Sequence, residues 1–305
     1  MPSVGGQTTT PIRVLLATDD SEAARCAEAW VSRLRWSQPC VVDVLCVAAH
    51  AITRFGWGMQ TYRATVRQAV EQLRQSELLA AERVANAVGE RLQRAGSMVH
   101  AWARQGDTAE EILAAIEQDR PDLVALGPRG RSGLAQLLLG GVSHEVIVAT
   151  TRPVLVARKP PADAGPLPRH LLLVVDGTLA AETAVDWLVR AAWAAGARVT
   201  LLGLLGVSPG VEDDQPTLTS GLTGLVRGDA TTALDRLAEP LRRQADTFTI
   251  ELAIGHPLEG VLRAAEDLEC DLIVVARPPR RRGQDPFAEK VVRHASTSVL
   301  IVPKT

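Results

Sequence analysis

The sequence contains no apolar run long enough to cross a membrane. Its longest runs, such as His170-Leu-Leu-Leu-Val-Val175, are far shorter than the roughly 18 to 20 residues of a membrane-spanning helix. Net charge is also small, because 33 Lys and Arg against 35 Asp and Glu leave a formal charge of −2. Such a balance creates no global attraction to nucleic acid or to an anionic membrane. We therefore expect neither of them as a partner.

Cysteines are few, and their spacing fits neither disulfide pairs nor a metal site. Cys26, Cys40, Cys46 and Cys270 lie within apolar patterns, as is typical of reduced core thiols in a cytoplasmic protein. Residues 1–10 are polar, without the basic start and apolar stretch of a secretory signal, and are expected to form a flexible tail. The sequence thus predicts a cytoplasmic location and no metal site.

The chain contains an internal duplication. In the first copy a segment Gly106-Asp-Thr-Ala-Glu-Glu-Ile-Leu is followed by Pro121-Asp-Leu-Val-Ala-Leu. In the second copy the corresponding segments are Gly255-His-Pro-Leu-Glu-Gly-Val-Leu and Cys270-Asp-Leu-Ile-Val-Val, and they are the same number of residues apart. A repeat of this kind divides the 305 residues into two domains of ordinary size. We assign residues 11–158 to the first domain, the proline-rich residues 159–168 to a linker, and residues 169–305 to the second domain.

Strands and helices are expected to alternate in both halves. Each half opens with an apolar run ending in aspartate, Ile12–Asp19 and Leu171–Asp176, which is typical of a strand covered on both faces. Ser21 and Thr178 are candidate N-caps for helices over residues 22–36 and 180–195. Further strands are expected at residues 41–47, 98–103, 123–126 and 154–157, and at 199–205, 248–253, 272–275 and 299–302. A longer helix is expected over residues 62–93 and a shorter one over residues 231–244. This pattern predicts an α/β fold of two tandem, doubly wound, five-stranded parallel sheets that are Rossmann-like.

A glycine-rich loop follows the fourth strand of the first half. Gly127 and Gly130 come directly after that strand, and Gly140 and Gly141 open the next helix. Glycines let backbone N–H groups approach an anion, and a helix N-terminus offers amides with positive dipole character. Ligands of such sheets sit beyond the carboxyl ends of the strands, where the strand order reverses. The loop therefore indicates a phosphate site, although similar loops can also be ordinary turns.

The spacing Gly-x2-Gly-x9-Gly resembles the signature of the universal stress proteins, in particular the ATP-binding subgroup in its tandem two-domain form, and the resemblance covers nearly the whole chain. It implies ATP with magnesium as the cofactor, with Asp19 at the adenine end and Val47 packed on the base. Gly141 stands where the family usually has Ser or Thr, which removes a hydroxyl donor but keeps the amide. The implied site residues are Ala17, Thr18, Asp19, Val47, Gly127, Arg129, Gly130, Gly140, Gly141, Val142 and Ser143.

Some of these residues have ordinary alternatives. Asp19 could cap the next helix, although Ser21 is placed to do so. Arg129 and Arg131 could pair with phosphate oxygens, or they could be solvated loop charges. His144, beside the loop, is expected on a helix surface and not as a catalyst, because no partner orients it.

The second half keeps the first-strand aspartate, Asp176, but replaces the glycine loop by Arg277-Pro-Pro-Arg-Arg-Arg. Prolines lack the N–H groups that a phosphate cradle needs. We expect this degenerate loop not to bind ATP. Arg280, Arg281 and Arg282 could serve an acidic partner, but a short charge run is usually a solvated loop.

The resemblance therefore implies a stress-response module that binds an adenine nucleotide in its first half. We expect it to hydrolyse the nucleotide slowly at most and not to be an enzyme. The alternatives are a scaffold or partner-binding protein without nucleotide and an ATP-using enzyme. The resemblance further implies that the last strands, Pro153–Ala157 and Ser298–Val302, pair at sheet edges. That pairing would give either a homodimer or an internal pseudo-dimer.

Overall fold

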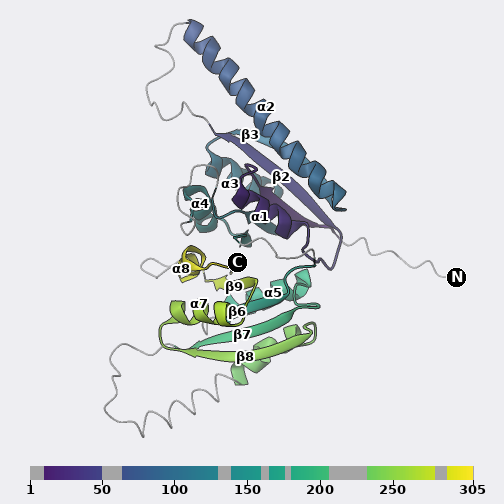
Figure 1. Ribbon diagram of the computed structural model, residues 1–305, viewed down its shortest axis with the longest axis vertical. Coiled ribbons are helices and arrows are strands. Elements are labelled where there is room, and N and C mark those ends of the chain that lie inside the picture. Colours follow the sequence, from purple (N-terminus) through teal and green to yellow (C-terminus); the bar gives the residue numbers. More distant parts are fainter. Residues whose placement is uncertain are drawn as a thin grey trace, which may run out of the picture.

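The computed structural model describes residues 10–49, 64–129, 139–158, 165–175, 180–205, 232–278 and 287–304. Figure 1 shows two halves stacked along the long axis, each a sheet flanked by helices. Several predictions fall outside these ranges, namely those on residues 1–9, 159–164, Gly130, Arg131, Asp176, Thr178 and Arg280 to Arg282. No helix within the ranges has the length and apolarity required to span a bilayer.

Both halves show the expected alternation of strands and helices. The first half consists of β1 (Ile12–Ala17), α1 (Glu22–Val31), β2 (Cys40–Ala49), α2 (Ala64–Arg94), β3 (Met98–Gly106), α3 (Thr108–Asp119), β4 (Leu123–Leu126), α4 (Gly141–Ala149) and β5 (Val154–Val156). The second consists of β6 (His170–Val175), α5 (Ala180–Ala191), β7 (Arg198–Leu205), a helix over residues 232–242, β8 (Thr247–Ile254), α7 (Pro257–Asp267), β9 (Leu272–Arg277), α8 (Phe287–His294) and β10 (Ser298–Pro303).

Two helices end earlier than predicted. α1 stops at Val31, because the chain beyond it turns to meet the segment that leads into the second half: the Leu167 N–H donates to the Arg33 carbonyl at 3.0 Å. α5 stops at Ala191, because Ala192 adopts a left-handed conformation with φ of 61°. Helical periodicity in the sequence continues past both points, but backbone conformation and tertiary contacts terminate the helices.

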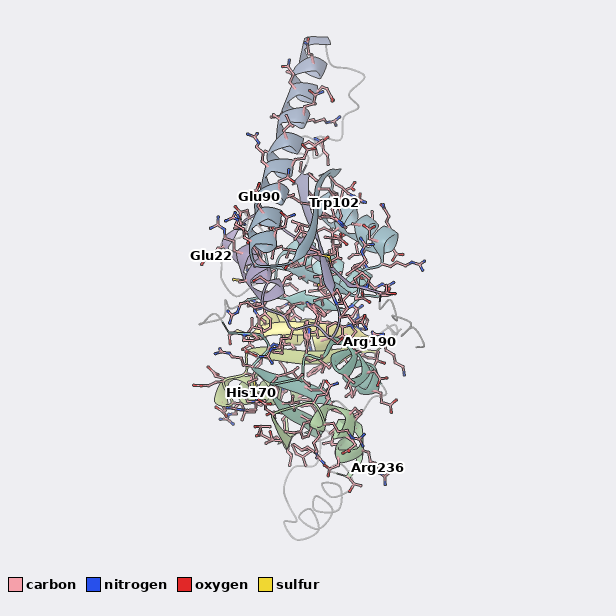
Figure 2. The ribbon with its side chains drawn as sticks, turned by 90° about the vertical axis from the view of Figure 1, so that its right-hand side faces the viewer. Glu22, Glu90, Trp102, His170, Arg190 and Arg236 are labelled. Carbon is pink, nitrogen blue, oxygen red and sulfur yellow. The ribbon has the colours of Figure 1, made fainter. Side chains whose placement is uncertain are left out.

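The strands form one continuous ten-stranded sheet, with the order β3-β2-β1-β4-β5-β10-β9-β6-β7-β8. Each half is parallel and doubly wound, which confirms the predicted fold class. The two five-stranded sheets are joined where β5 and β10 pair antiparallel, with Leu300 opposite Leu155. Figure 2 shows β10 in yellow near the middle of the molecule. The last strands of the two halves, which we expected to form either a homodimer or an internal pseudo-dimer, thus pair with each other within the chain.

Helices cover both faces of this sheet along its whole length. One face packs against α1, α2, α5 and the helix over residues 232–242. The other packs against α3, α4, α7 and α8. Because each buried cluster draws residues from both halves, the apolar core continues across the junction between them. Parallel strands covered in this way are apolar throughout, as the runs in the sequence indicated.

The duplicated aspartate of the repeat has a structural role. Asp122, just before β4, accepts the Arg13 backbone N–H at 3.0 Å. Asp271, just before β9, accepts the backbone N–H groups of Arg169 at 2.9 Å and His170 at 3.2 Å. In both halves the carboxylate therefore fixes the start of the first strand against the fourth. This shared contact explains part of the repeat without reference to a ligand.

Replacing Leu155 by alanine tests the junction. Leu155 is fully buried and lies opposite Leu300, so the substitution should lower the free energy of unfolding by about 2 to 5 kcal/mol. Because the core spans both halves, urea denaturation followed by circular dichroism should show one transition at a lower midpoint. Leu79, exposed on α2, is the matched control, and its alanine variant should change stability by less than about 0.5 kcal/mol. Two separate transitions in the wild type would contradict this account.

Candidate functional site

A cavity of about 480 Å³ lies at the carboxyl ends of the strands of the first half. β1 has β2 on one side and β4 on the other, so the strand order reverses between β1 and β4. Ala17 at the end of β1 and Leu126 at the end of β4 both line the cavity. This is the location that ligands of doubly wound sheets occupy.

The structure brings the predicted site residues together around this cavity. It describes every one of them except Gly130, and each described one lines the cavity wall. They are Ala17, Thr18, Asp19, Val47, Gly127, Arg129, Gly140, Gly141, Val142 and Ser143. Their roles toward a ligand stay predictions, but residues from four separate segments of the chain converge on one site.

The turn between β1 and α1 presents Asp19 to the cavity. Ser21 caps α1, because its Oγ accepts the Ala24 N–H at 3.3 Å. Asp19 instead closes the turn, with its Oδ1 accepting the Ser21 N–H at 3.0 Å. The question of which side chain caps the helix is therefore answered in favour of Ser21.

Asp20, the next residue, fixes this turn from the outside of the cavity. Its φ is 56°, and Arg25 and Arg91 both donate hydrogen bonds to its carboxylate. The hydrogen bond from Arg25 is the main cause that lowers the pKa of Asp20 below its usual value, and Arg91 acts in the same direction. Arg91 also bonds Glu28 at 2.7 Å, so it ties α2 to both the turn and α1.

The glycines of the loop serve different purposes. A Cβ on Gly127 would lie 2.6 Å from the backbone carbon of Ala23, so this glycine allows α1 to pack closely. The Gly140 amide donates to the Pro128 carbonyl at 2.7 Å and is already occupied. A Cβ on Gly141 would meet nothing within 4 Å. The open space beside Gly141 is compatible with an anion, whereas Gly127 has in addition a packing reason to be glycine.

The N-terminus of α4 borders the cavity, because the residues from Gly140 to Ser143 line its wall. Gly140 occupies the N-cap position and has no side chain to satisfy them. The first-turn amides of Gly141, Val142 and Ser143 have no acceptor within the helix, and this end carries the positive pole of the helix dipole. The buried Ser143 hydroxyl donates to the Gly127 carbonyl at 2.9 Å and so joins the two ends of the loop.

Two helices supply cavity residues that the sequence did not reveal. They are Glu77, Ala80, Ala81 and Val84 of α2 and Thr108 and Ile112 of α3. The only sequence signal was a pair of small residues, Ala80 and Ala81, on a helix whose packing could not be read from its periodicity. Glu77 adds a carboxylate to the wall.

His144 lies outside the cavity wall. Its Nε2 is 3.6 Å from Oε2 of Glu289 on α8, and its side chain is 41% exposed. This agrees with the predicted position on a helix surface and gives the residue a partner in the second half. Among the residues that the structure describes, no three His, Cys, Asp or Glu side chains are grouped to hold a metal ion.

Comparisons with known proteins agree with this architecture. The model of the universal stress protein family matches residues 12–158 and again residues 168–303. A universal stress protein of Mycolicibacterium smegmatis is 26% identical over 181 residues, which are 59% of this chain and 59% of that protein. Another, from Methanocaldococcus jannaschii, is 38% identical over 65 residues, which are 21% of this chain and 38% of that protein. The chain therefore covers less than two thirds of the length of these curated relatives.

Solved structures share this fold over nearly the whole chain. The crystal structure of a universal stress protein from Archaeoglobus fulgidus has a TM-score of 0.63 at 19% identity, covering 96% of each chain. A universal stress protein structure from Pseudomonas aeruginosa has a TM-score of 0.56 at 14% identity, covering 96% of this chain and 94% of that one. At these identities the likeness establishes the fold.

Two alanine substitutions test the different purposes of the loop glycines. Gly127→Ala should lower the free energy of unfolding by about 1 to 3 kcal/mol, because the new Cβ collides with the backbone of α1. Gly141→Ala should leave stability unchanged or slightly raised, because the methyl group enters open space at a helix start. Urea denaturation of both variants measures the difference. Equal stabilities would show that the close contact with Ala23 is unimportant.

Proposed function

The chain belongs to the universal stress protein family, and we propose that its first domain binds ATP and acts as a stress-response binding module. The observation that carries the proposal is the cavity at the strand-order reversal, bordered by a helix N-terminus whose N-cap is glycine. Backbone amides at such an end are a ready-made phosphate site. We assign the nucleotide to the domain at residues 11–158 and a supporting role to residues 169–305.

The proposed adenosine end of the site lies near β2 and α2. Val47 and the small side chains of Ala80 and Ala81 supply apolar surface for a base. Asp19 and Glu77 supply carboxylate acceptors, which suit an exocyclic amine or ribose hydroxyls. A mostly apolar wall with a few polar groups is typical of small-molecule sites.

The proposed phosphate end lies at α4. The amides of Gly141, Val142 and Ser143 would bind phosphate oxygens, and Arg129 of the same wall adds a cation. Bound magnesium would neutralise phosphate charge and would be held mainly by the phosphate oxygens and by water.

We propose a binding module and not an enzyme, with ATP hydrolysis slow at most. His144 points toward Glu289 and does not line the cavity, so it is not placed to activate a water molecule there. We also propose a cytoplasmic location, since all four cysteines are free and burial raises the pKa of the Cys40 and Cys270 thiols to about 12. Thiols of this kind are unreactive and suit a reducing compartment.

Thermal denaturation with and without Mg-ATP tests the proposal. Nucleotide at 100 times its dissociation constant should stabilise the folded chain by about 2.7 kcal/mol and raise the melting temperature accordingly. ADP, cAMP and GTP in the same series would define the nucleotide preferred. Absence of stabilisation by every adenine nucleotide would overturn the proposal and favour a partner-binding scaffold.

Substitutions at Gly141 separate binding from folding. Gly141→Asp should leave the protein folded, because nothing lies within 4 Å and an acidic residue suits the start of a helix. It should nevertheless abolish the Mg-ATP shift, since the carboxylate repels phosphate. Gly141→Ser, the matched control, should keep or increase the shift by adding a hydroxyl donor. An undiminished shift in the aspartate variant would place the phosphates elsewhere.

A further inference from the structure

A residue of the second half holds the carboxyl-terminal end of α4. The guanidinium of Arg277, the last residue of β9, donates hydrogen bonds to the carbonyl oxygens of Ile147 and Thr150. The last carbonyl oxygens of a helix accept no hydrogen bond from the helix itself, so Arg277 donates to groups that would otherwise need water. Its positive charge also complements the negative end of the helix dipole.

This contact results from the antiparallel junction of the two halves. Because β5 and β10 run in opposite directions, the carboxyl ends of the strands in one half lie at the edge where the strands of the other half begin. α4 runs from the cavity to the opposite edge of the sheet, where the strands of the first half begin and those of the second half end. Its last turn therefore comes next to the end of β9, where the second half has arginine and proline instead of a glycine loop.

α4 has little stability of its own. It is nine residues long, starts with glycine and is rich in β-branched residues, with no acidic residue in its first turn and no basic residue in its last. Glycine and β-branched residues weaken helices, and a helix this short depends on contacts outside itself. Arg277 supplies from the second half the last-turn cation that the sequence of α4 lacks.

A second contact joins α4 to the second half, this time to α8. The His144 imidazole of α4 lies 3.6 Å from the Glu289 carboxylate of α8, which is 7% exposed. Figure 1 shows α4 and α8 facing each other across the junction. The helix that borders the cavity is thus held by the second half at two points, one of them at its carboxyl end.

We infer that Arg277 is a positioning residue for the nucleotide site of the first half. By fixing the carboxyl end of α4, it keeps the amides of the opposite end directed at the phosphates. Arg277 itself is not among the residues that line the cavity, so it acts only through the helix. This inference rests on the proposed ATP binding, and it predicts an effect confined to ligands that carry phosphate.

Calorimetric titration of the full chain with Mg-ATP and with adenosine tests the inference. Arg277→Met keeps the aliphatic stem but removes both hydrogen bonds. It should weaken Mg-ATP binding about fivefold or more, where fivefold is the lower end of the range of coupling between two sites. Adenosine, which does not use the α4 amides, should bind as to the wild type. Arg277→Lys keeps the charge without the planar fork and should give intermediate Mg-ATP affinity. If Arg277→Met does not fold, Arg277→Lys is compared with the wild type instead.

Arg263→Ala is the matched control, because Arg263 is an exposed arginine of the second half on α7. It should leave both affinities unchanged. Equal Mg-ATP affinity in the wild type and Arg277→Met would overturn the inference, as would an equal loss of Mg-ATP and adenosine affinity, which indicates general destabilisation. A wild-type protein that binds neither ligand would instead overturn the proposed function, so the two failures are distinguishable.

Discussion

The antiparallel pairing of β5 with β10 is the constraint on which the rest of the molecule depends. It converts two sheets with exposed apolar edges into one sheet whose inner edges are covered, and unpaired edges of that kind favour aggregation. It also fixes how the halves face each other. Because the strands of the two halves run in opposite directions, α4 starts at the cavity and ends beside the carboxyl end of β9, where Arg277 can reach it.

The duplication kept its geometry while its chemistry diverged. In the first half, buried Asp43 on β2 bonds Arg13 of β1 at 2.6 Å and His100 of β3 at 3.2 Å. At the matching positions of the second half His170 bonds Thr200 at 3.0 Å, and Thr200 bonds Thr249 at 3.0 Å. An ionic row is thus replaced by a neutral one, and burial lowers the pKa of His170. The fourth strands differ in the same way, because β4 leads into a glycine loop and β9 ends in Arg277 followed by proline.

The sequence predicted most of what depends on local pattern. Apolar runs located the strands, Ser21 was a correct N-cap, and the loop glycines lie at the edge of the sheet where the structure has its cavity. What it missed depends on tertiary contacts. The early end of α1, the α2 wall of the cavity, and the packing reason for Gly127 all require knowing which backbone lies opposite. A glycine in a sequence shows that a side chain is missing, but not which atoms occupy the space.

The second half, which has no glycine loop, contacts the helix that borders the cavity of the first half. A short helix rich in β-branched residues has unsatisfied amides at one end and unsatisfied carbonyls at the other. Arg277 satisfies the carbonyls, and an anion in the cavity would satisfy the amides. Two groups that stabilise the same helix favour each other's binding, and such coupling is reciprocal. Nucleotide in the first half would therefore strengthen the contact between Arg277 and α4, so that binding in the cavity would also stabilise the junction of the two halves.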